Sequence, residues 1–209
     1  DNIMVTAGSQ QALDYLGKLF LSPGDTALVG WPTYLGALAA FNAYEPRYDQ
    51  LTLHGNRTAA SYTDGAATQG SAVKFAYLSP DFANPTGETL DLAGRKNLLA
   101  LAEELDCVII EDAGYQSLRY GGRPVPPVLA LELQQKGEID ACRTVYCGSF
   151  SKTLSPGLRI GWVVAAEPVI SKMVLLKQAA DLHSATINQM AVHHVAQTCF
   201  DAHVAQLHA

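Results

Sequence analysis

The segment at residues 149–162, SFSKTLSPGLRIGW, sets one lysine among hydroxyl side chains, seven residues before an arginine. Most lysines are solvated surface charges, so Lys152 by itself is weak evidence for catalysis. Its neighbours strengthen the case. Ser149 and Ser151 are small hydrogen-bond donors, and Arg159 carries a planar, permanently charged fork that suits a phosphate group. The segment therefore predicts a reactive amine next to an anion-binding site.

A second candidate for anion binding lies near the start of the chain. The segment GSQQALD at 8–14 follows an apolar run and opens a helical pattern. Backbone N–H groups of Ser9 and Gln10, together with the helix dipole, would favour an anion there. The alternative is that Ser9 only caps the helix. Combined with the serines and arginine of 149–162, this segment predicts one phosphate-binding site.

Three further polar residues follow apolar, strand-like runs. Asp112 ends the run at 107–112, where a carboxylate is costly unless it is paired, because burial raises its pKa. Tyr115 comes three residues later. Asn84 opens NPTG, in which proline and glycine favour a turn but do not explain the asparagine. For Asp112 the alternative is a residue that caps the next turn.

The elements that must position these residues alternate along the chain. Short β-branched runs alternate with longer helical patterns, which is typical of parallel βαβ units. We therefore expect an α/β fold with three layers, α/β/α, around a mostly parallel sheet of seven strands. Strands are expected at 3–6, 26–30, 46–51, 73–78, 107–112, 144–149 and 159–165. Helices are expected at 9–20, 34–43, 91–105 and 167–180, with a last helical stretch after Ser184.

Two local features refine this scheme. Asp91 is a good N-cap for the helix expected at 91–105, whose apolar stripe includes Leu98 and Leu101. Residues 54–70 are small and polar, so they are expected to form a loop with one helical turn at most.

In open α/β sheets, ligands bind beyond the carboxyl ends of the strands, and all the candidate segments follow strands or open helices there. Together they offer a phosphate cup, a carboxylate, a phenol, an amide and one lysine. Pyridoxal 5′-phosphate needs such a set: its aldehyde condenses with an amine, its ring nitrogen pairs with an acid, and its phosphate needs an anion site. The residues therefore predict this cofactor.

The whole chain resembles the fold-type I, class I and II aminotransferases. The family's motifs occur in order as GSQQALD, PTY, NPTG, EDAGY and SFSKTLSPGLRIG. The resemblance implies that Lys152 forms the Schiff base with the cofactor and that Asp112 pairs with its pyridine nitrogen. It implies that Asn84 and Tyr115 bind the 3-oxygen and that Tyr34 stacks on the ring, although Tyr34 could instead be a core aromatic on a helix.

The same resemblance implies five phosphate-binding positions: Ser9, Gln10, Ser149, Ser151 and Arg159. The implied catalytic residues are Lys152, Asp112 and Tyr115. The implied reaction moves an amino group from an amino acid to a 2-oxo acid. GSQQALD and SPGLRIGW are most similar to the branch that handles aromatic and 2-aminoadipate-type substrates.

By the same resemblance, residues 1–209 correspond to the large cofactor-binding domain. The N-terminal arm and the small C-terminal domain, which carries the arginine for the substrate carboxylate, would lie outside this segment. The opening DNIMVTAGSQ starts within a strand-like run, which fits a segment of a longer polypeptide. A homodimer is expected by analogy with the family.

Other functions remain open on the sequence alone. Regulators of the MocR type fuse an aminotransferase-like domain to a DNA-binding module and could contain every motif quoted above. A helix-turn-helix upstream of Asp1 would favour the regulator. A pyridoxal-phosphate-dependent lyase on the same fold is a further alternative. An α/β domain in which Lys152 is merely structural would leave the joint occurrence of the motifs unexplained.

Composition excludes several classes of partner. The chain has 209 residues, 48% of them hydrophobic, and a formal net charge of −6 with no basic stripe, so neither nucleic acid nor anionic lipid is an expected partner. No run of eighteen apolar residues occurs. The four cysteines form no CxxC pair, which favours a reducing, cytoplasmic setting and gives no metal site.

Overall fold

Seven strands form one sheet in the order β1-β7-β6-β5-β4-β2-β3 within residues 2–52, 55 and 57–208, which the computed structural model describes. Strand β7 runs antiparallel to both of its neighbours, and the other pairs are parallel. This confirms the expected mostly parallel sheet. The strands are β1 (Ile3–Thr6), β2 (Thr26–Gly30), β3 (Arg47–Leu51), β4 (Val73–Leu78), β5 (Val108–Asp112), β6 (Thr144–Ser149) and β7 (Gly161–Val164).

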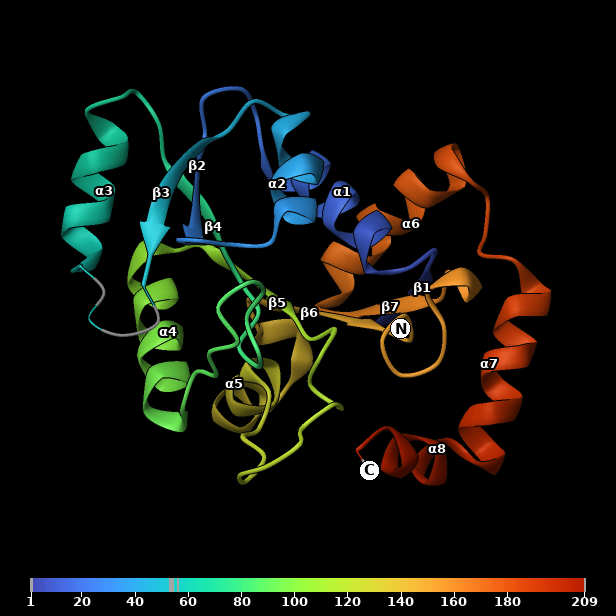
Figure 1. The fold of residues 1–209 in the computed structure, drawn as a ribbon. Helices are drawn as coiled ribbons and strands as arrows, with labels where there is room; N and C mark the ends of the chain where they lie inside the picture. The colour runs from blue at the N-terminus through green and yellow to red at the C-terminus, as the bar shows by residue number, and fades with distance from the viewer. Residues whose placement is uncertain (1, 53–54, 56, 209) are drawn as a thin grey trace.

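Helices cover both faces of this sheet (Figure 1), so the three-layer α/β/α prediction is confirmed. On one face lie α1 (Ser9–Phe20), α2 (Leu35–Asn42) and α6 (Glu167–Ala180). On the other lie α3 (Ala59–Ala67), α4 (Leu92–Leu105) and α5 (Val128–Lys136). Two helices follow at the end, α7 (Thr186–Thr198) and α8 (Phe200–Leu207).

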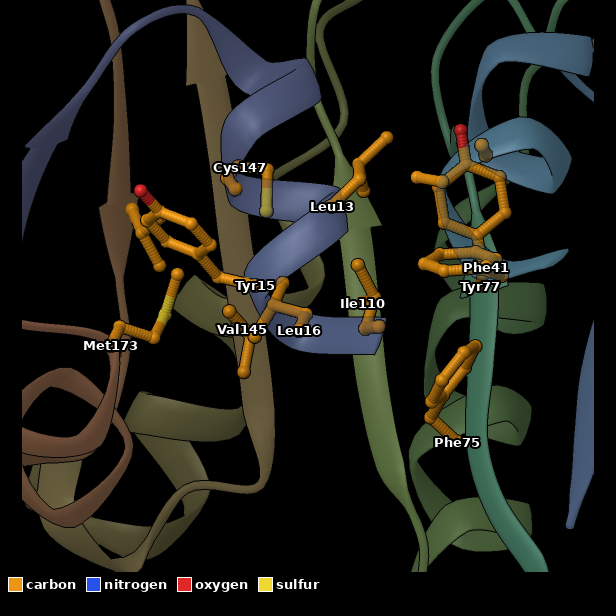
Figure 2. Close-up of a cluster of buried hydrophobic side chains, with 14 of the residues drawn as sticks. Leu13, Tyr15, Leu16, Phe41, Phe75, Tyr77, Ile110, Val145, Cys147 and Met173 are labelled. Carbon is orange, nitrogen blue, oxygen red and sulfur yellow. The ribbon is translucent and has the colours of Figure 1, made fainter. Parts of the chain in front are cut away.

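The larger core lies between the sheet and the α1 face (Figure 2). Leu13 and Leu16 of α1 are fully buried and belong to the same cluster as Ile110 and Val145 of the central strands. A strand buried on both faces reads as a continuous apolar run, which is why the central strands could be located from sequence. This core packs α1 against the central strands β5 and β6.

Helix α4 begins where the sequence predicts. The Asp91 side chain accepts a hydrogen bond from the Gly94 N–H at 2.7 Å, which confirms it as the N-cap. Leu98 and Leu101 are buried, as the predicted stripe requires. Predicted helices at 9–20 and 167–180 coincide with α1 and α6.

The expectation of a loop over 54–70 is wrong for most of that segment. Nine of its residues form helix α3, Ala59–Ala67, and residues 54 and 56 lie outside the described part of the chain. Thr58 caps the helix by accepting from the Ser61 N–H at 3.3 Å. Tyr62 and Ala66 are buried against the sheet, so tertiary packing decides the structure of a segment whose polar residues suggest a loop.

Helix α5 and the start of β7 also differ from the prediction. The sequence analysis places no helix at α5, which follows a segment at 121–127 with three prolines and two glycines. Strand β7 begins two residues later than predicted, since Arg159 adopts a left-handed conformation (φ 51°) that ends a 3-10 turn before the strand.

Helices α7 and α8 leave the layered body at its edge (Figure 1). Only Val192 of α7 is buried and no residue of α8 is. Ile187 and Met190 of α7 are 76% and 66% exposed. Among the described residues, no helix combines the length and apolar character needed to cross a membrane.

Candidate active site

One cavity of about 360 Å³ brings together every site residue predicted from the sequence. It opens beyond the carboxyl ends of β4, β5 and β6, beside the start of α1. The predicted residues that line it are Ser9, Gln10, Tyr34, Asn84, Asp112, Tyr115, Ser149, Ser151, Lys152 and Arg159. Segments far apart in sequence therefore converge as the position of their strands requires.

Lys152 lies in the turn that follows β6 and is exposed to the cavity. Its Nζ lies 5.5 Å from the ring centroid of Tyr115, so the amine and the phenol face the same space. The turn is held by the buried Ser149, whose hydroxyl accepts from the Ser151 N–H at 3.1 Å. Phe150 closes it by donating its N–H to the Ile160 carbonyl at 3.1 Å.

Asp112 ends β5 as a buried carboxylate. Burial raises its pKa, while the Tyr77 hydroxyl, the Gly114 N–H and the positive charge of Lys152 lower it. The Tyr77 hydroxyl donates to Oδ2 at 2.9 Å. Asp112 is therefore a buried carboxylate with a hydroxyl partner, and its pairing with a ring nitrogen stays a prediction.

Tyr77 is a residue that sequence reasoning missed. It stands in the apolar strand β4, 35 residues from Asp112, and its hydroxyl is directed at the carboxylate. A buried tyrosine hydroxyl needs a hydrogen-bond partner. The tyrosine in VKFAYL therefore carried a usable signal, although its partner could not be named without the fold.

The start of α1 forms the anion-binding end of the cavity. Gly8 is its N-cap, and within this fully described helix no side chain caps the first turn and no acidic residue occupies it. Ser9 is thus the first helical residue rather than the cap. Gly8 has φ 81°, and a Cβ there would overlap the Arg159 guanidinium. Free N–H groups and a guanidinium are therefore gathered at one point.

Hydrogen bonds from the Arg159 guanidinium fix its position. Nη2 donates to the Ala7 carbonyl at 3.0 Å and Nη1 donates to the Pro156 carbonyl at 3.1 Å. These bonds leave part of the fork facing the cavity.

Gln10 and Tyr34 form the side of the cavity next to α2. The Gln10 side chain donates to the Gly36 carbonyl at 2.6 Å, which ties α1 to α2. Tyr34 stands at the N-cap position of α2 and is half-buried. Its ring lies over Gly36, where a Cβ would overlap it. The ring therefore lines the cavity and also packs against the core, and its stacking on a cofactor stays a prediction.

Taken together, cationic and N–H donors, a buried carboxylate and an amine line the one cavity. This donor set fits a flat ligand with a phosphate, a basic ring nitrogen and an aldehyde, which is the chemistry of pyridoxal 5′-phosphate.

Residues 1–206 match the family model for class I and II aminotransferases. The chain belongs to this family. It is 42% identical over 193 residues to aromatic-amino-acid aminotransferase 1 of Thermococcus litoralis, covering 90% of this chain and 45% of that protein. It is 38% identical to the 2-aminoadipate transaminase of Thermus thermophilus, covering 96% of this chain and 49% of that protein.

Among solved structures, this aminotransferase-family chain is similar to the kynurenine aminotransferase of Pyrococcus horikoshii, a structure that contains PMP. The TM-score is 0.87 at 41% identity, over 99% of this chain and 50% of that one. The relatives also include a transcriptional regulator of the HTH type, YisV of Bacillus subtilis, at 32% identity over 90% of this chain. The chain spans about half the length of the curated aminotransferases it matches.

Proposed function

We propose that the full-length protein is a pyridoxal-phosphate-dependent aminotransferase that moves an amino group between an amino acid and a 2-oxo acid. The observation that carries this proposal is the shared cavity of Lys152, Asp112 and Arg159. An amine, a buried carboxylate and a guanidinium face one space, which matches the three functional groups of the cofactor. Residues 1–209 would be its large cofactor-binding domain.

Each group of the site has a task in this proposal. Arg159, Ser149, Ser151 and the first N–H groups of α1 would hold the phosphate. Tyr34 would cover one face of the ring. Asn84 and Tyr115 would donate hydrogen bonds to its 3-oxygen. When bound, pyridoxal 5′-phosphate supplies an electron sink that takes up the charge left on carbon after a proton is removed.

Lys152 would first hold the cofactor through its amine and then act as a general base. Its Nζ would remove a proton from the substrate α-carbon and deliver it to the C4′ position of the cofactor. Asp112 would keep the ring nitrogen protonated, because a carboxylate in a buried site stabilises a neighbouring N–H. The Tyr77 hydrogen bond supports this role, since it favours the charged form of Asp112.

The substrates are proposed from the relatives. Proteins named for aromatic amino acids and for 2-aminoadipate are 42% and 38% identical, which supports a broad specificity of that type. A panel of amino donors with 2-oxoglutarate as acceptor tests this in the full-length protein. We expect aromatic donors and 2-aminoadipate to be converted to 2-oxo acids. If a donor instead loses a β- or γ-substituent, the protein is a lyase.

The remaining partners are also proposals. We propose a homodimer, supported by the exposed apolar residues of α7 and testable by sedimentation equilibrium of the full-length protein. A cytoplasmic location is supported by the four cysteines, none of which forms a disulfide in the described chain.

A second function is favoured by the similarity to HTH-type regulators. In that case the same cavity would bind the cofactor as an effector. The sequence upstream of Asp1 distinguishes the two functions, because a basic helix-turn-helix there would identify a regulator.

A further inference from the structure

Asp81 is a buried carboxylate that lies outside the cavity, in the loop that follows β4. It is 2% exposed, and two arginines bind the same oxygen, Oδ1. Arg95 of α4 is fully buried and its Nη2 lies 2.9 Å from that oxygen. Arg119, from the loop between β5 and α5, donates to it with its own Nη2. We call Asp81, Arg95 and Arg119 the arginine clasp.

The clasp also binds the backbone of both loops. Arg95 donates to the carbonyl oxygens of Leu90 at 2.9 Å and Pro80 at 3.3 Å, which lie in the loop between β4 and α4. Its Nη1 donates to the Pro126 carbonyl at 3.0 Å, which lies in the loop between β5 and α5. One side chain therefore joins the two loops.

Arg119 adds a second connection between them. Its guanidinium lies over the Phe82 ring, 4.7 Å from the centroid. Phe82 stands two residues before Asn84, and Arg119 stands four residues after Tyr115. The clasp thus joins the two loops that carry the residues proposed to bind one oxygen of the cofactor.

Because the charges of the arginine clasp are buried, the geometry of their contacts is narrowly defined. A charge removed from water needs partners with good geometry, and loss of one partner leaves the other uncompensated. The planar guanidinium of Arg119 can bind Asp81 and stack on Phe82 at the same time only at one distance between the β4–α4 loop and the β5–α5 loop. Apolar packing would hold them with less geometric precision.

We propose that Asp81 and Arg119 are positioning residues that set the distance between Asn84 and Tyr115, so that both side chains reach the same ligand oxygen. This inference rests on the proposed function, because it assumes that the oxygen is the 3-oxygen of pyridoxal phosphate.

The test compares two ligands of the full-length protein, pyridoxal 5′-phosphate and 3-deoxypyridoxal 5′-phosphate, which lacks that oxygen. Arg119→Met should weaken binding of pyridoxal phosphate by about 5- to 10-fold, because hydrogen bonds to the 3-oxygen are lost or lengthened. Its affinity for the deoxy compound should match that of the parent. Arg119→Lys keeps the charge but not the fork, so it should show part of the same selective loss.

Arg143→Met is the matched control. Arg143 is similarly half-buried and pairs with Asp106 at 3.2 Å, but it directly precedes β6 and so lies at the amino end of that strand, whereas the cavity opens beyond the carboxyl ends. It should leave both affinities unchanged.

Equal losses for both ligands in Arg119→Met, or no loss for either, would overturn the inference. If Arg119→Met does not fold, the same comparison is decided by Arg119→Lys. A parent protein that binds neither ligand would refute the proposed function itself, which is a different result.

Discussion

Arg159 combines a structural and a proposed binding task. It holds the Ala7 and Pro156 carbonyl oxygens while it lines the cavity. Arg159→Ala should weaken pyridoxal phosphate more than pyridoxal, because only the phosphorylated ligand loses a charge-assisted pair. Arg159→Lys should recover part of the affinity, since an ammonium cannot reproduce the fork. Titration of both ligands measures this. Equal losses would mean that Arg159 acts only by holding the loop at Ala7.

Tyr77 tests the electrostatics of the other end of the cavity. Tyr77→Phe removes the hydroxyl that favours the charged form of Asp112, so the pKa of that carboxyl should rise further. We expect turnover to fall by about tenfold or more, as for loss of one hydrogen bond to a charged group.

Tyr44→Phe is the control, since that hydroxyl bonds to Asp14 at 2.9 Å away from the cavity. It should not change turnover. If steady-state kinetics give the same rate for Tyr77→Phe and the parent, Tyr77 does not tune Asp112.

Residues in the cavity and residues that support it differ in how far the sequence predicts their roles. Lys152 and Arg159 share one short segment, and Asp112 ends a recognisable strand. Local sequence patterns are therefore enough to single out these residues. Tyr77 and Asp81 escape such reasoning because each is defined by a partner more than thirty residues away. The role of a buried polar residue can be assigned only when the fold shows which residue it is bonded to.

At the scale of elements, α4 and α5 show the same contrast. Helix α4 carries its own cap at Asp91 and could be predicted. Helix α5 has no side-chain cap of its own at Pro127. Its first N–H groups are bound by Glu111 of β5, which accepts from Val128 at 2.8 Å and Leu129 at 3.0 Å. This helix depends on a long-range contact that no local pattern contains.

Glu111 makes the stability of this element depend on pH. Burial raises its pKa to about 7 from an ordinary value of 4.5, against the opposing effect of the two N–H groups. Because the folded pKa exceeds the unfolded one, the stability that this group contributes is full below about pH 4.5 and is lost as the pH rises through 7.

Glu111→Gln stays neutral and should remove that dependence. Urea unfolding at several pH values measures it. The free energy of unfolding of the variant, minus that of the parent, should increase between about pH 5 and pH 8. A difference that is constant over this range would contradict the role assigned to Glu111.

For the whole molecule, the sheet order places the carboxyl ends of β4, β5 and β6 side by side. The sequence predicts the strands and their parallel direction, but their order depends on which helices cross which face. That order brings Asn84, Asp112 and Lys152 to one cavity. The chain spans about half the length of its curated relatives, so the proposed activity is assigned to the full-length protein.

The central claim is that Lys152 holds pyridoxal phosphate, and one measurement tests it directly. The full-length protein is incubated with the cofactor, reduced with borohydride to fix the cofactor to the amine it has joined, and mapped by peptide mass spectrometry. We predict a phosphopyridoxyl group on Lys152 and its loss in Lys152→Ala. A label on another lysine, or equal labelling of the Lys152→Ala protein, would contradict the account.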